Sequence, residues 1–337
     1  MRRALGWTAL AAIALALPWL MYPVLATDIV TWGLFAAAFD ILLGYTGLLS
    51  FGQAAYFGGG AYAAALLAQR AGVSFPLNAL AAGLIAGAMA VPLMGLAIRR
   101  RGIYFAMITL AFAEMVFYVI NEWRSLTGGE NGVQGIPRVA PGGFSLASPL
   151  VYYYTALPLA VLGLLLCWRI VRSPFGRVLL AIRENEVRTE MLGYPVVRYK
   201  LIAAVLSCAI SGFAGGLWVI NHGFVALDAV HWSTSGLVLT MVLLGGIGTR
   251  LGPLAGAALV LYLRDFLSTW TDAWGVVTGL IFIAVILIFR RGIVGTLEPL
   301  LVRGPKAGRV SPSQPGLSPQ GGPGLSPQGG PRRRLTG

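Results

Sequence analysis

The acidic residues Asp40 and Glu114 lie inside strongly apolar stretches of the chain. An ionised aspartate at the centre of a membrane helix costs roughly 2.5–3.5 kcal/mol, so each carboxyl requires a partner, a polar cavity or protonation. At about 100° per residue, Glu114 lies within about 80° of Tyr104 and Tyr118, which gives its helix one polar and aromatic stripe. Both acids are candidates for lining a solute path; the alternative is a hydrogen bond across a helical bundle.

A second group of polar residues lies in the uncharged segment 44–62, GYTGLLSFGQAAYFGGGAY. A phosphate-binding P-loop needs GxxxxGK[ST], and neither this segment nor GGIGTRLGP at 245–253 contains a lysine. Within an apolar region, glycines allow close helix contact or a broken helix buried in protein. We therefore expect a broken or re-entrant segment beside the solute path, with polar contacts from Tyr45, Ser50 and Gln53.

The histidines His222 and His231 share the segment NHGFVALDAVHW with Asp228. This trio could bind a metal or sense pH, although two histidines nine residues apart in a loop are more often plain surface residues. Cys167 and Cys208 lie in apolar runs without a CxxC motif, which predicts small buried side chains. The sequence has no clustered catalytic set, so we expect a chain that is not an enzyme and holds no cofactor or metal.

Membrane helices must position these residues, because the chain is 57% hydrophobic and 11% charged, against roughly 25% charged residues in soluble domains. Apolar runs of bilayer length predict an all-α, polytopic membrane bundle of about ten spans. The expected spans are 4–26, 29–46, 54–70, 77–98, 103–121, 151–171, 200–220, 233–249, 251–267 and 274–290. Eight full spans remain if the second and third, or the eighth and ninth, form a re-entrant pair. The first run also has some features of a signal peptide, but its length favours a retained helix.

Basic residues set the expected orientation. With ten spans and an inner N-terminus, all but four of the 25 Lys and Arg residues fall on the inner side, as the positive-inside rule requires. Both termini are therefore expected in the cytoplasm. The net charge of +13 does not predict nucleic acid binding, because the basic residues are not interleaved with base-stacking aromatics.

The chain is expected to divide into a membrane domain at 1–302 and a cytoplasmic tail at 303–337. In the tail, GLSPQGGP occurs at 316–323 and again at 324–331. Such Pro-, Gly- and Ser-rich sequence cannot bury a core and is expected to be disordered.

Three glycine pairs in the membrane domain are spaced four residues apart. This spacing places both glycines on one helix face and allows close helix contact in lipid. The pairs are Gly83 with Gly87, Gly212 with Gly216, and Gly252 with Gly256.

The longest inner loop, about 172–199, carries the strongest signal for a partner protein. Its apolar positions are Val178, Ile182, Met191 and Leu192, and its charges are Arg183, Glu184, Glu186, Arg188 and Glu190. The pattern predicts one short amphipathic helix that stands off the membrane and ends near Gly193. Its mixed charge favours a groove on another protein over lipid head groups.

Several segments together resemble the membrane permease subunits of branched-chain amino acid ABC importers, in their LivM-like branch. The matching segments, in order over about 30–295, are LLGYTGLLSFGQAAYFGGGAY, LTGGENGVQGIP, SPFGRVLLAIRENEVRTEMLGY, AISGFAGGLW and VLLGGIGTRLGPLAGA. Two features depart from the family. Asp40 stands where asparagine is common, and the repetitive tail has no counterpart.

The resemblance implies an importer subunit in the bacterial inner membrane that moves Leu, Ile, Val or related solutes by alternating access. Its implied partners are a second, LivH-like permease, two cytoplasmic ABC ATPases that use ATP and Mg, and an extracytoplasmic solute-binding protein. The implied coupling residues are Arg183, Glu184, Glu186 and Gly193, although the EAA-type loop pattern is only loosely met. The expected path residues are Asp40, Tyr45, Ser50, Gln53 and Glu114.

Two alternatives stay open at this point. The same machinery could import urea or short amides. A self-contained secondary transporter could instead use Glu114 and Asp40 as proton sites, and it would need no ATPase.

Overall fold

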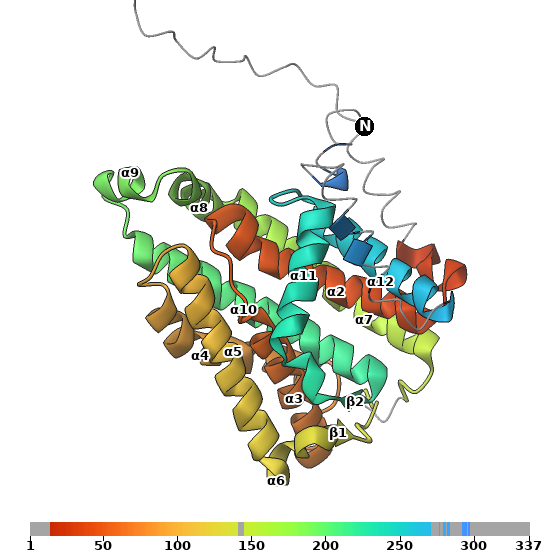
Figure 1. Ribbon diagram of the computed structural model, residues 1–337. Helices are drawn as coiled ribbons and strands as arrows, with labels where there is room; N and C mark the ends of the chain where they lie inside the picture. The colour runs from red at the N-terminus through yellow and green to blue at the C-terminus, as the bar shows by residue number, and fades with distance from the viewer. Residues whose placement is uncertain are drawn as a thin grey trace, which may run out of the picture. The chain divides into compact units, whose positions relative to one another are not determined.

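The computed structural model describes residues 14–140 and 145–270, with isolated residues between 276 and 296. In chain order its elements are α2 (Pro23–Asp40), η1 (Ile41–Thr46), α3 (Gln53–Arg70), α4 (Leu77–Ala97), α5 (Ile103–Glu122), α6 (Arg124–Thr127), η2 (Gly129–Asn131), β1 (Val133–Gln134), α7 (Pro149–Arg172), α8 (Pro174–Glu184), α9 (Glu186–Met191), α10 (Val196–His222), β2 (Phe224–Val225), η3 (Leu227–Ala229), α11 (Trp232–Gly245) and α12 (Gly252–Trp270). Within the described ranges the strands are two residues each, so the predicted helical class is confirmed there (Figure 1).

Five of the described helical segments are long and apolar enough to cross a membrane. They are Pro23–Thr46, Leu77–Ala97, Ile103–Glu122, Pro149–Arg172 and Val196–His222. The last four match the expected spans to within four residues at either end, and the first ends at the expected residue. The first begins at Pro23, earlier than expected, because proline lacks the N–H that the first turn would leave unpaired.

The other five expected spans are not shown as crossings. α3 and α12 form at the expected places but include polar or charged residues, and α11 has only 14 residues, fewer than the roughly 20 that a bilayer requires. The runs at 4–26 and 274–290 reach well outside the described residues, as does the expected tail at 303–337. The count of ten stays a prediction.

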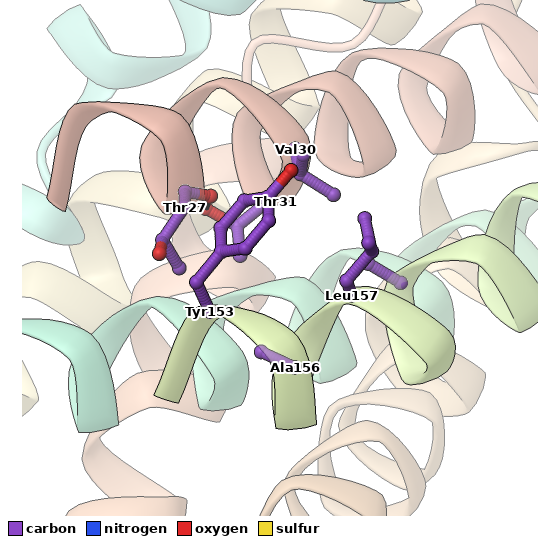
Figure 2. A pocket seen from close by; sticks show the side chains of 7 residues that line it. Thr27, Val30, Thr31, Tyr153, Ala156 and Leu157 are labelled. Atoms are coloured by element: carbon purple, nitrogen blue, oxygen red, sulfur yellow. Dashed lines mark hydrogen bonds between the residues drawn. The ribbon is translucent and has the colours of Figure 1, made fainter. Parts of the chain in front are cut away.

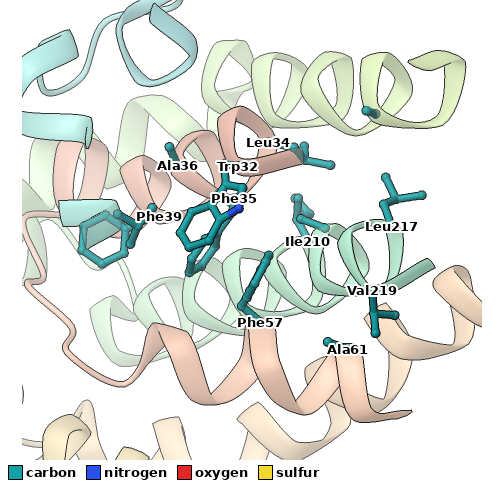
Figure 3. Close-up of a cluster of buried hydrophobic side chains, with 14 of the residues drawn as sticks. Trp32, Leu34, Phe35, Ala36, Phe39, Phe57, Ala61, Ile210, Leu217 and Val219 are labelled. Carbon is teal, nitrogen blue, oxygen red and sulfur yellow. The ribbon is translucent and has the colours of Figure 1, made fainter. Parts of the chain in front are cut away.

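α10 is the central helix of the bundle and packs against α2, α3 and α4. Aromatic residues fill the space between α2 and α3, where the rings of Phe35 and Phe57 stack with centroids 4.4 Å apart. Trp32 lies beside them, and Ile210 and Leu217 approach from α10 (Figure 3). The buried face of α2 is therefore apolar along most of its length.

Small residues let α10 cross its neighbours closely. A Cβ at Gly83 of α4 would lie 3.0 Å from the Ala209 carbonyl oxygen, and one at Gly216 would lie 2.9 Å from the Ala79 Cα. Gly256 of α12 approaches α11 in the same way, because a Cβ at Gly256 would lie 2.9 Å from the Gly245 nitrogen. The predicted role of the paired glycines in helix contact is confirmed.

The two ends of α10 carry different structures (Figure 1). At its start lie α8 and α9. At its end, β2 pairs antiparallel with β1, with Val225 opposite Val133. Because a 27-residue helix is about 40 Å long, these two ends are separated by more than the hydrocarbon core of a bilayer.

Candidate coupling and translocation site

The predicted break near residue 44 is present. α2 ends at Asp40, a π-helical turn covers Ile41–Thr46, and the backbone is then irregular until α3 begins at Gln53. Gly47 ends the turn with φ +75°, a left-handed conformation that glycine adopts without strain. Much of the irregular segment is buried in the bundle, which agrees with the rule that non-helical backbone at membrane depth must be covered by protein.

Asp40 and Tyr45 both bind the backbone of one residue, Gly248, in a distant loop. The Asp40 carboxylate, 2% exposed, accepts the Gly248 N–H at 3.0 and 3.2 Å. The Tyr45 hydroxyl donates to the Gly248 carbonyl at 3.0 Å. A Cβ at Gly44 would lie 2.7 Å from the Gly248 nitrogen, so glycine permits this close approach. The loop between α11 and α12 is thereby held against the end of α2.

Arg183, from the last turn of α8, joins the same junction. Its Nη1 donates to the Gly44 carbonyl. A Cβ at Gly47 would lie 3.1 Å from the Arg183 Cγ. A cation near the C-terminal end of a helix complements the helix dipole and partly offsets the unfavourable position of Asp40 there.

The Asp40 hydrogen bond makes a testable prediction for stability. Asp40→Asn is expected to change the free energy of unfolding by less than about 1 kcal/mol, because the amide oxygen still accepts the Gly248 N–H. Asp40→Ala removes the acceptor and is expected to cost about 1–3 kcal/mol. Thermal unfolding of the purified chain in detergent measures both, with Glu190→Ala on the exposed face of α9 as control. Equal losses for the two Asp40 variants would contradict the hydrogen-bond account.

Ser50 and Gln53, two expected path residues, are fully buried within the chain. The Gln53 amide donates to Ser207 at 2.7 Å and to Ser211 at 3.0 Å on α10. Ser207 in turn donates to the Ala38 carbonyl at 2.6 Å. These bonds fasten the start of α3 to α10 and α2. Ser50 accepts the Gly52 N–H at 3.3 Å within its own segment.

Glu114 faces away from the bundle. It is exposed, and it makes no hydrogen bond or ion pair with the residues that the structure describes. Tyr104 and Tyr118 are 69% and 64% exposed on the same helix, which confirms the predicted stripe. α5 as a whole is little covered, because 22% of its most apolar 18-residue stretch is buried. For Glu114, a hydrogen bond across the chain's own bundle is not found among the described residues, whereas Asp40 makes one to Gly248.

The loop at about 172–199 contains two helices where one was predicted. α8 ends at Glu184, and Asn185 then caps α9 by accepting the Arg188 N–H at 2.9 Å. Asparagine is a strong N-cap because its side-chain oxygen satisfies a free backbone donor. The amphipathic prediction holds for α8, whose Leu179 and Ile182 are buried.

The far end of α9 exposes a large apolar tip. Met191 is 82% exposed and Leu192 is 71% exposed, beside the exposed Val187. Glu184 is exposed as well. Gly193 turns the chain back toward α10 with φ +88°, and no atom lies within 4 Å of the position that a Cβ would take there. Apolar side chains at a loop tip that nothing in the described chain covers are typical of an interaction surface.

Glu186 is tied to its own chain. Its carboxylate lies 2.7 Å from the Lys200 Nζ and 3.2 Å from Arg101. Lys200, at the start of α10, is only 3% exposed, so this pair neutralises a buried cation. The expected coupling residue Glu186 therefore anchors α9 to α10.

The trio of His222, His231 and Asp228, which the sequence raised as an alternative to plain surface residues, is not assembled in the described chain. His222 pairs with Asp28, its Nε2 lying 3.4 Å from the Asp28 carboxylate, and Asn221 donates to the same carboxylate at 3.1 Å. His231 instead caps α11 through Ser233. No cluster of three metal-ligating side chains occurs among the described residues. Both cysteines are free and buried, as predicted.

Two hollows border these elements. The first lies between α2 and α7 (Figure 2) and is too small to hold a water molecule. Its labelled lining residues are Thr27, Val30, Thr31, Tyr153, Ala156 and Leu157. The second, a cavity of about 190 Å³, lies between the broken segment and the α8–α9 pair. It is lined by Thr46, Gly47, Leu48, Arg101, Gly102, Ile182, Arg183, Glu184, Asn185, Glu186 and Lys200.

Sequence reasoning missed several residues of these contacts, namely Asp28, Arg101, Lys200, Ser207, Ser211, Asn221 and Gly248. Gly248 lay in a segment that was weighed as a phosphate site and quoted for the family resemblance, but not as a partner of Asp40. Asp28 and Lys200 are charged residues beside apolar runs, and their rarity there was a usable signal.

The chain matches the family model described as branched-chain amino acid transport system / permease component over residues 22–287. It is 29% identical over 300 residues to the high-affinity branched-chain amino acid transport system permease protein LivM of Salmonella typhimurium, covering 82% of this chain and 71% of that protein. For LivM of Escherichia coli the identity is 30% over 285 residues, covering 78% and 67%.

A further relative is the autoinducer 2 import system permease protein LsrC of Klebsiella pneumoniae, 30% identical over 207 residues and covering 56% of each chain. No solved structure matches the chain. The family match extends from α2 through α12, and the apolar helices suit an integral membrane protein. The chain belongs to the branched-chain amino acid transport system permease family, the membrane subunits of ABC-type transporters.

Proposed function

We propose that this chain is the permease subunit of an ATP-driven importer that moves branched-chain amino acids by alternating access. The observation that carries the proposal is the α9 tip, where Met191 and Leu192 are uncovered. A partner that accepts this tip in a groove can move α9, and with it the helices to which α9 is tied. ATP and Mg would be used by that partner, an ATPase present in two copies.

The outward face of α5 supplies a second surface. Glu114 lies near the middle of this helix between exposed apolar and aromatic side chains. A carboxyl at that depth requires a polar neighbour, since burial in lipid is costly. A second, LivH-like permease packed against α5 would enclose a path between the two chains, with Glu114 on its wall. A solute-binding protein would deliver the cargo at the far end.

The same proposal assigns the sides of the membrane. α8 and α9 would face the cytoplasm, because the basic residues of this region follow the positive-inside pattern. The end that carries β1 and β2 would then face the binding protein. The protein would reside in the bacterial inner membrane with both termini inside.

The relatives support the cargo to different degrees. The two LivM proteins are named for branched-chain amino acids, and this chain matches at least two thirds of the length of each. The LsrC similarity is shorter but favours autoinducer 2 as a second candidate cargo. We place Leu, Ile and Val first because the longer matches point to them.

The test is uptake into proteoliposomes that contain the chain with the permease, ATPase and binding-protein subunits expressed beside it. Radiolabelled leucine is expected to accumulate only with ATP inside and binding protein outside. Competition by unlabelled isoleucine, valine and autoinducer 2 then ranks the cargoes. Accumulation driven by a proton gradient without ATPase subunits would sink the proposal.

Glu114→Gln separates ATP-driven import from a proton-coupled carrier. An ATP-driven importer is expected to keep leucine uptake within about threefold of wild type, because glutamine preserves the polar group without its charge, a change worth under about 1 kcal/mol. A proton-coupled carrier would lose uptake, since its proton site would be gone. Initial uptake rates measured between pH 6 and pH 8 give the comparison. The control is Tyr118→Phe, a substitution at an exposed position on the same helix.

A further inference from the structure

We propose that Arg183 is a positioning residue that links α8 to the broken helix by capping its final turn at Gly44. The inference deepens the proposed function and rests on it. Arg183 thereby transmits movement of the α8–α9 pair to the broken segment between α2 and α3. It does so within the chain, whereas the family resemblance places Arg183 among residues that face the ATPase.

The first argument is the direction of the side chain. Arg183 leaves the last turn of α8, and its Nη1 donates to the carbonyl of Gly44. Gly44 belongs to the last turn of the π-helix Ile41–Thr46. Carbonyls at a helix end lack partners within the helix, and a cation there satisfies them and complements the dipole. The guanidinium therefore stabilises the helical conformation of this turn.

The second argument is that the cap belongs to a three-way junction. The same turn holds Tyr45, whose hydroxyl donates to the Gly248 carbonyl at 3.0 Å, and Asp40 accepts the Gly248 N–H. A Cβ at Gly248 would lie 3.5 Å from the Arg183 Nη1. The end of α8, the broken helix and the loop before α12 thus meet at one point. Displacing Arg183 disturbs all three.

The third argument is that polar bonds bridge a gap in the packing between these parts, beside the apolar contact that Leu179 and Ile182 of α8 make with the core. The cavity of about 190 Å³ separates Thr46–Leu48 from the α8–α9 turn. Close-packed groups transmit displacement, and a gap between them does not. On the two sides of the gap, the links are Arg183 to Gly44 and Glu186 to Lys200 and Arg101. Of these, the Arg183 bond is the one that reaches the broken helix.

The first experiment measures hydrogen–deuterium exchange of the full purified chain in lipid nanodiscs. Arg183→Gln is expected to speed exchange about tenfold or more in peptides covering 41–52 and 246–250, because the cap that closes local opening is lost. Arg183→Lys retains a donor and is expected to restore part of the protection. Arg99→Gln, an exposed arginine outside the junction, is expected to leave it unchanged. Unchanged exchange in Arg183→Gln overturns the proposal.

The second experiment uses the complete complex and compares ATP hydrolysis with solute uptake. Arg183→Gln is expected to raise the ATP consumed per leucine imported by about tenfold while ATPase activity persists, and Arg183→Lys is expected to recover part of the coupling. A parallel fall of hydrolysis and uptake would instead place Arg183 in ATPase docking and overturn the proposal. If the wild-type complex shows no ATP-driven uptake, the proposed function fails, whereas the exchange measurement still judges the junction.

Discussion

The double substitution Met191→Asp with Leu192→Asp is expected to lower ATP-driven uptake by about a hundredfold or more, which corresponds to losing two buried anchors of an interface. Both side chains are more than two thirds exposed in the chain alone. Their loss should therefore leave folding intact, since no apolar contact within the described bundle depends on them. Uptake into proteoliposomes and co-purification of the ATPase subunits measure the effect together.

Arg100→Asp serves as the control, because it adds negative charge at another exposed position, in the turn between α4 and α5. The amount of permease in the membrane, read by immunoblot, should be the same for all variants. If the double variant still binds the ATPase and transports at wild-type rates, the α9 tip is not the docking surface.

The substitution Gly212→Leu is expected to lower the stability of the bundle by about 3 kcal/mol or more, through overpacking at a helix crossing. A Cβ at this position would lie 3.0 Å from the Ala82 carbonyl of α4 and 3.3 Å from the Tyr56 carbonyl of α3. Backbone atoms on both neighbouring helices cannot move aside as a side chain can. Thermal unfolding in detergent, followed by recovery of monodisperse protein, reports the change.

Gly95→Leu is the matched control. Gly95 also lies within a helix, but no atom lies within 4 Å of the position that its Cβ would take. Leucine there should be neutral or slightly stabilising, because it is a better helix former than glycine. Equal destabilisation by both variants would show that loss of glycine itself, rather than the crossing, is responsible.

Local features of this fold could be predicted from the sequence. The break near Gly44 was predictable because glycines and polar residues interrupt an apolar run. The spacing of Gly83 and Gly87 predicted a close helix contact, although it did not say that α10 would be the partner. The cap at Asn185 was also readable, since asparagine before Glu186 is a helix-start signal, and the prediction of one continuous helix overlooked it.

Long-range pairings could not be predicted. Asp40 and Gly248 are separated by about two hundred residues, and no periodicity records that a carboxylate will meet one particular N–H. The partner of Glu186 was equally hidden. Lys200 beside an apolar run signals that some anion should pair with it, but nothing in the sequence says that the anion is Glu186. Glu114 was placed correctly on a polar stripe, while the side to which the stripe turns depended on how every neighbouring helix packs.

The junction at Gly44 bears on protein engineering. To pair this permease with the ATPase of another transporter, a designer could replace the loop 172–199 alone. The graft would also replace Arg183, whose hydrogen-bond acceptor lies in a segment that remains behind. On the proposal that this loop docks on an ATPase, we expect a chimera to work better when 40–48 and 246–250 are exchanged together with the loop. Compatibility with the ATPase would then be encoded in three separate stretches of the gene.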